Sequence, residues 1–216
     1  MAFRDRADAG RVLAAGLGHL AGAEGLMVLG LPRGGVPVAH EVAGALHAPL
    51  DVFLARKLGV PRQPELAMGA VAAGGVIVLH HAVVDALSIP PSVIEAVAAR
   101  EAAEVARRER AYRAGRPPLD VADRSVVVVD DGLATGSTMR AAVAALRARH
   151  AGRIVVAVPV GASATCRQLA GEADEVVCAS MPASFHAVGQ WYDDFTQTTD
   201  DEIRALLGTK EDHHGQ

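Results

Sequence analysis

The sequence predicts an α/β fold of the doubly wound type, with helices on both faces of a mainly parallel sheet. Apolar runs at 26–31, 126–129 and 154–160 lack polar alternation, which is typical of strands that are covered on both faces. Segments with helical periodicity separate these runs, and this order favours parallel strands joined by right-handed crossovers. The chain shows no internal repeat or linker, so we expect one domain over 1–207, with its core at about 26–180.

The individual elements follow from local patterns. Helices are expected where apolar residues recur every three or four positions. The clearest is 92–113, where Ser92 and Glu95 form a capping box and Glu104 lies four residues before Arg108 as a favourable ion pair. The other expected helices are 5–20, 36–47, about 137–149 and about 163–171; the other expected strands are 50–55 and 175–179, with a hairpin over 69–79 around Gly74 and Gly75.

The composition excludes several classes of protein. Half of the 216 residues are hydrophobic but only 3% are aromatic, so Val, Ala and Leu must build the core. The net charge of -4 argues against nucleic acid or an anionic membrane as the main partner. No apolar run approaches the roughly 20 residues of a membrane span, and no secretory signal is visible, so a cytoplasmic protein is expected. Cys166 and Cys178 are expected to be buried or half-buried thiols, and 208–216 a disordered tail.

The stretch VVVVDDGLATGSTM at 126–139 carries the strongest functional signal. Its last residues lie where a loop becomes a helix, so free backbone N–H groups and the helix dipole favour a phosphate at 135–138. Asp130 and Asp131 can accept hydrogen bonds from a diol, or hold a Mg²⁺ ion shared with a phosphorylated ligand. A phosphate beside a diol describes a ribose 5-phosphate. The alternative is an ordinary strand–turn–helix, which two buried carboxylates make costly.

This stretch resembles the phosphoribosyl-pyrophosphate (PRPP) motif of the type I phosphoribosyltransferases, with four apolar residues, two acids and a small-residue T-G-x-T loop. The resemblance implies that Asp130 and Asp131 bind the ribose hydroxyls. It also implies that the 5-phosphate is held by the loop residues Ala134, Thr135, Gly136, Ser137 and Thr138.

A second loop, LGLPRGGVPVAHEVA at 29–43, resembles the pyrophosphate loop of that family. Glycine lets a backbone approach a ligand closely, and arginine offers a forked cation that suits phosphate oxygens. The resemblance also implies a mobile basic flap near 55–75. The alternative interpretation of this segment is a basic turn exposed to solvent. The residues assigned to pyrophosphate are Arg33, Gly34, Gly35, Arg56 and Lys57, with Arg62 as a further flap cation and Glu65 as an outside candidate for an acid–base role.

The resemblance implies a hood that grips the base, expected at about 181–200 with the N-terminal helix. Four of the seven aromatic residues lie at 185–195, which suggests stacking on a flat ligand. The segment resembles the base-reading part of hypoxanthine-guanine transferases, whereas Ala134 stands where those enzymes carry an acid. The alternative is that these rings only cap the core. The base-binding candidates are Phe185 or Trp191 for stacking and Asp193 or Asp194 for hydrogen bonding, with His186 beside them; His80 and His81 are expected in a surface turn.

The implied reaction is Mg²⁺-dependent transfer of 5-phosphoribose from PRPP to a nitrogenous base, with release of pyrophosphate. A purine is favoured over a pyrimidine. The resemblance also implies a homodimer, while neither nucleic acid nor a membrane is an expected partner. Two other functions remain open: a non-catalytic module that senses PRPP or a nucleotide, and a nucleotide hydrolase, for which the two loops offer no base or nucleophile.

Overall fold

A computed structural model describes residues 2–208 of the chain, except for the side chains of Pro64 and Glu65. The tail expected at 208–216 therefore lies outside the described residues, apart from Gly208. The Glu65 side chain, suggested for an acid–base role, also lies outside the described part. The centre of the fold is a five-stranded parallel sheet, which confirms the predicted fold class. In spatial order its strands are β2 (Leu50–Val52), β1 (Met27–Gly30), β6 (Ser125–Val129), β7 (Arg153–Val160) and β8 (Glu175–Ser180).

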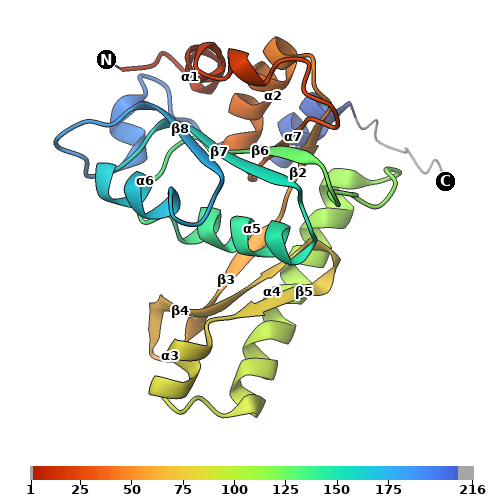
Figure 1. Ribbon diagram of the computed structural model, residues 1–216, viewed down its shortest axis with the longest axis vertical. Helices are drawn as coiled ribbons and strands as arrows, with labels where there is room; N and C mark the ends of the chain where they lie inside the picture. The colour runs from red at the N-terminus through yellow and green to blue at the C-terminus, as the bar shows by residue number, and fades with distance from the viewer. Residues whose placement is uncertain (1, 209–216) are drawn as a thin grey trace.

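Helices cover both faces of this sheet (Figure 1). Helices α1 (Arg6–Ala15) and α2 (Gly35–Leu46) lie on one face, and α5 (Ser137–Ala148) and α6 (Ser163–Leu169) lie on the other. Successive side chains of a strand point to opposite faces. Val127 and Val129 therefore pack in the core under α1 and α2, whereas Val126 and Val128 pack in the core under α5.

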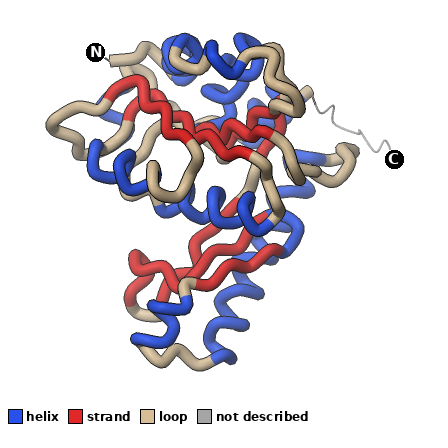
Figure 2. The backbone as a smooth tube through the Cα atoms, in the orientation of Figure 1, coloured by secondary structure: helices blue, strands red, loops and turns tan. Residues whose placement is uncertain are grey.

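A second, antiparallel sheet projects from the main one beyond α5 (Figure 2). Its strands are β3 (Ala55–Val60), β4 (Gln63–Ala72) and β5 (Val76–Leu79), and the short helix α3 (His81–Ala86) follows. The long helix α4 (Pro91–Arg113) packs against this sheet and against α7 (Asp200–Leu207), in a shared core that includes Leu58, Met68, Val105, Tyr112 and Ile203. Helix α4 thus joins the small sheet to the C-terminal end of the described chain.

Four local predictions need correction. The expected strand 50–55 is two strands in different sheets, because the chain leaves the parallel sheet after Val52. The segment expected as a flap loop is the β3–β4 hairpin, where Val60 pairs with Gln63 across a two-residue turn. Helix α4 begins at Pro91 with no side-chain cap, since proline is pre-organised for a first helical position, so the Ser92–Glu95 box does not form. The expected turn at the two histidines is the start of α3, at His81.

Other local expectations are confirmed. The hairpin over 69–79 is present as β4 and β5, joined at Ala73–Gly75. Cys166 is buried and Cys178 is half-buried, and neither is in a disulfide. Within residues 2–208, the helices are all too short or too polar to cross a membrane.

The first described residues lie beside the segment expected to form the hood. Phe3 forms a parallel bridge with Tyr192, next to the 3₁₀ helix Val188–Trp191. The Phe3 backbone donates to the Trp191 carbonyl at 2.8 Å and accepts from the Asp193 N–H at 2.8 Å. These bonds fix the beginning of α1 against the segment that follows the last strand.

Candidate active site

The two loops singled out in the sequence meet at one edge of the sheet. Strands β1 and β6 are parallel neighbours, so their carboxyl ends lie side by side. Leu31 N–H donates to the Val129 carbonyl at 2.9 Å, and the Pro32–Arg33 peptide bond is cis. A Cβ atom on Gly34 would lie 1.9 Å from Asp131 Oδ2, and one on Gly35 would lie 2.5 Å from the Val129 carbonyl oxygen. Both glycines are therefore required for the first loop to lie against the aspartates of the second.

The predicted phosphate loop, residues 134–138, surrounds the N-terminus of α5. Gly136 precedes the helix with φ 74°, a left-handed conformation that favours glycine, and no side chain caps the helix. The Thr165 hydroxyl donates to the Ala134 carbonyl at 2.7 Å and anchors the loop to α6. The hydroxyls of Thr135 and Ser137 lie 3.2 Å apart. Uncapped N–H groups beside two hydroxyls form a donor set of the kind that can bind a phosphate.

The two aspartates have different surroundings. Asp130 Oδ1 accepts the Asp131 N–H at 2.9 Å, and burial, together with the charge of Asp131, raises the pKa of Asp130 well above its ordinary value. Asp131 Oδ2 lies 2.9 Å from Nε of Arg6, and the Tyr192 hydroxyl donates to the Asp131 carbonyl at 2.5 Å. Burial also raises the pKa of Asp131, while Arg6 opposes that shift. Arg6 therefore supports the charged form of Asp131.

A cavity of about 340 Å³ brings the phosphate loop together with basic side chains. It is lined by Leu31, Pro32, Leu54, Ala55, Arg56, Lys57, Arg108, Thr135, Ser137 and Thr138. Five of these ten residues are sequence-predicted phosphate or pyrophosphate ligands, namely Arg56, Lys57, Thr135, Ser137 and Thr138. Arg108 is a lining residue that the sequence did not predict. The predicted cations Arg56 and Lys57 do lie at this cavity, on β3, opposite the start of α5.

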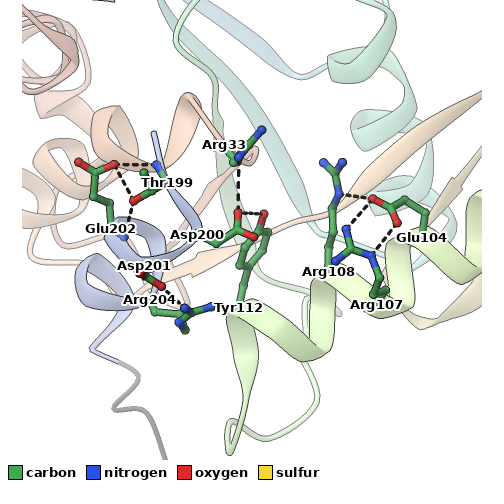
Figure 3. A network of polar contacts seen from close by, with 10 residues as sticks. All are labelled: Arg33, Glu104, Arg107, Arg108, Tyr112, Thr199, Asp200, Asp201, Glu202 and Arg204. Atoms are coloured by element: carbon green, nitrogen blue, oxygen red, sulfur yellow. Dashed lines mark hydrogen bonds and ion pairs between the residues drawn. The ribbon is translucent and has the colours of Figure 1, made fainter. Parts of the chain in front are cut away.

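Several arginines around the cavity are paired with acids. Arg56 Nε lies 2.5 Å from Glu101 Oε2, and Arg108 Nε lies 2.6 Å from Glu104 Oε1. Arg33 turns toward α7, where its Nη1 atom lies 3.8 Å from Asp200 Oδ1 (Figure 3). The predicted pyrophosphate arginine Arg33 is thus not among the residues that line the cavity.

The hood candidates lie away from this cavity. Phe185 and Trp191 pack against the cluster of Phe3 and Tyr192, as rings that cover the core do. Asp193 and Asp194 are exposed, and their backbone N–H groups donate to the N-terminal segment. His186 Nε2 lies 3.2 Å from the Ser184 hydroxyl. Neither these residues nor the flap residue Arg62 lines the 340 Å³ cavity, and their role toward a base stays a prediction.

Two site residues escaped sequence reasoning, for different reasons. Arg6 and Asp131 are 125 positions apart in the sequence, and no local sequence pattern predicts their contact. The sequence predicts Arg108 as the partner of Glu104, and that pair is present. The i,i+4 spacing identifies the ion pair, but only the packing of α4 shows that Arg108 faces the cavity.

Comparisons with known proteins identify the family of the chain. Residues 4–195 match the family described as phosphoribosyl transferase domain. Proteins from two Mycobacterium tuberculosis strains, provisionally named phosphoribosyl transferases, are 51% identical over 205 residues, which is 95% of this chain. The chain spans 46% of the length of those relatives.

A solved structure, TT1426 from Thermus thermophilus, is 45% identical and superimposes with a TM-score of 0.89 over 96% of this chain and 98% of that one. The family match and the solved structure thus agree with the fold described above. The chain belongs to the phosphoribosyl transferase domain family.

Proposed function

We propose that the chain transfers the 5-phosphoribosyl group of PRPP to a nitrogen nucleophile and releases pyrophosphate. The observation that carries this proposal is the 340 Å³ cavity, in which an uncapped helix N-terminus faces a set of arginine and lysine side chains. PRPP carries a phosphate at one end and a pyrophosphate at the other, so it needs two anion sites at one cavity. A polar cavity of this size lies within the usual range for small-molecule sites.

Each part of the site has a role in this reaction. The backbone N–H groups at 135–138 would bind the 5-phosphate. Arg56 and Lys57 would stabilise the negative charge that grows on the departing pyrophosphate, where electrostatic preorganisation helps most. Asp131, oriented by Arg6, would accept hydrogen bonds from the ribose hydroxyls and offset the positive charge that develops on the sugar.

The chain's own residues fit a Mg²⁺ ion only as part of a complex with the substrate. Among residues 2–208, no group of three or more His, Cys, Asp or Glu side chains is placed to hold a metal. Mg²⁺ is commonly bound through one or two carboxylates plus substrate phosphates. Asp130 and Asp131 are the carboxylates that would hold it here. When bound, the ion would neutralise charge on the pyrophosphate.

A purine is the proposed acceptor, ahead of a pyrimidine. Support comes from the order of residues in the hood, which places aromatic rings and two acids within 185–195. Val188 of the hood also lies against the PRPP loop, since a Cβ atom on Gly132 would lie 2.4 Å from its Cγ1. This contact supports the proposal that the hood would lie beside a base attached at the ribose site.

The test is to incubate the protein with PRPP, Mg²⁺ and a panel of purine and pyrimidine bases. Products are identified by mass spectrometry, and pyrophosphate release is followed in parallel. We expect a nucleoside monophosphate whose formation matches the release of pyrophosphate. PRPP binding without a product from any base would favour the sensing function instead. Failure to bind PRPP would overturn the assignment of both loops.

A further inference from the structure

We propose that Arg108 of α4 is an additional pyrophosphate-binding residue of this site. This inference rests on the proposed function, and it adds a residue from outside both loops. Helix α4 runs from the small sheet toward the main sheet (Figure 1), and Arg108, near its C-terminal end, lines the cavity. Arg108 lies there with Arg56 and Lys57 of β3, and with Thr135 and Ser137 across the cavity.

The guanidinium of Arg108 binds Glu104 through its Nε atom. Its Nε atom lies 2.6 Å from Glu104 Oε1, one helical turn earlier (Figure 3). The planar guanidinium has further donors on its Nη atoms, in a fork that matches phosphate oxygens. Hydrogen bonds from Arg107 and Arg108 lower the pKa of Glu104 to about 2. Glu104 is therefore charged at neutral pH and restrains Arg108 whether or not a ligand is present.

The surroundings of Arg108 indicate the pyrophosphate end of the cavity. Tyr112, four residues after Arg108 on α4, donates to Asp200 Oδ1 at 2.8 Å, the same atom that Arg33 of the predicted pyrophosphate loop approaches (Figure 3). Burial raises the pKa of the Tyr112 hydroxyl to about 12, and the charges of Arg108 and Arg33 both oppose that shift. On the other side, Glu101 of the same helix pairs with Arg56. Arg108 therefore belongs to a group of cations between the pyrophosphate loop and β3, and the 5-phosphate has its own donors at the start of α5.

Arg107 provides a matched control within the same helix. It binds the same carboxylate, with Nε 2.8 Å from Glu104 Oε2 and Nη2 2.9 Å from Glu104 Oε1. Its side chain is 60% exposed, compared with 32% for Arg108, and it does not line the cavity. The two arginines thus share their charge, their helix and their partner, and differ in whether they face the site.

The experiment is calorimetric titration of inorganic pyrophosphate, PRPP and ribose 5-phosphate into wild type, Arg108→Gln and Arg107→Gln. Loss of a bidentate charged contact should weaken pyrophosphate and PRPP binding by about tenfold or more in Arg108→Gln. Ribose 5-phosphate binding should stay within about twofold, and Arg107→Gln should match wild type for all three ligands. Arg108→Lys, which keeps the charge but not the fork, should fall between wild type and Arg108→Gln.

Two results would overturn the inference while leaving the proposed function intact. One is equal weakening by Arg107→Gln and Arg108→Gln, which would mean a general effect of charge. The other is an equal loss of all three ligands in Arg108→Gln, which would mean a change in the fold of the site. If wild type binds none of the three ligands, the proposed function fails first, and the inference fails with it.

Discussion

Arg6 Nε lies 2.9 Å from Asp131 Oδ2 and joins the first turn of α1 to the carboxyl end of β6. Both side chains are largely buried, with 11% and 15% of their surface exposed. The guanidinium of Arg6 also lies 4.1 Å from the ring centre of Phe195 and donates to the Thr196 carbonyl at 2.7 Å. The N-terminal segment therefore connects the proposed ribose carboxylate to the hood.

Arg6→Gln is expected to destabilise the protein by about 1–3 kcal/mol, because it leaves a largely buried carboxylate without its cation. The control is Arg11→Gln, on the same helix. Arg11 is 49% exposed and pairs with Asp8 and Glu41 at 3.4–3.5 Å, so its loss should change stability by no more than about 0.5 kcal/mol. Urea unfolding of the three proteins measures the difference. Equal stability of the two variants would mean that the Arg6–Asp131 pair contributes nothing to the free energy of unfolding.

Asp130→Asn is expected to stabilise the ligand-free protein, by about 0.5–2 kcal/mol at neutral pH. Burial raises the pKa of Asp130, so between the unfolded and folded pKa values the folded protein holds a proton that the unfolded chain has released. Stability therefore falls as the pH rises through that window, and the loss is complete above the folded pKa. Asparagine does not ionise, and its Oδ1 atom can still accept the Asp131 N–H.

Urea unfolding between about pH 4 and pH 7 tests this prediction, since the advantage of Asp130→Asn should shrink toward the acid end. The same variant should lose affinity for PRPP, because the ribose site loses a carboxylate. An advantage that does not change with pH would show that the charge of Asp130 carries no cost in the folded state.

Gly136→Ala is expected to disrupt the phosphate loop. Gly136 has φ 74°, and an added Cβ atom would lie 2.6 Å from Thr165 Cγ2. The substitution should cost about 1–3 kcal/mol of stability and weaken ribose 5-phosphate binding by about tenfold or more. Gly44→Ala is the control, because Gly44 lies inside α2 with no atom within 4 Å of the added Cβ, where alanine favours the helix. Thermal unfolding measures the change in stability, and calorimetry measures ribose 5-phosphate binding. Equal binding of ribose 5-phosphate by both variants would contradict the prediction.

The sequence predicts most of what is local in this protein. The run VVVVDDGLATGST specifies a strand covered on both faces, its polar end and the start of a helix within 13 residues, and all three are present in order. Contacts between distant segments leave no such pattern. The bonds of Arg6 to Asp131 and of Thr165 to the Ala134 carbonyl join different elements, and they depend on how α1 and α6 pack on the sheet.

The β3–β4 hairpin shows a different limit. Its prolines indicated a loop, yet Pro61 lies in the turn, and the flanking residues pair as strands. Proline is compatible with a hairpin when it lies outside the hydrogen-bonded ladder. The pairing, and the approach of β3 to α5 that places Lys57 at the cavity, come from tertiary packing.

The central claim is that the two loops form one PRPP site, and the most direct measurement is calorimetric titration of PRPP with Mg²⁺. Wild type is compared with the double variant Asp130→Asn, Asp131→Asn. We predict saturable binding to wild type and a loss of affinity of about a hundredfold or more in the double variant, since two carboxylates that accept ribose hydroxyls are removed. Unchanged affinity in the double variant, with its fold verified by circular dichroism, would contradict the claim.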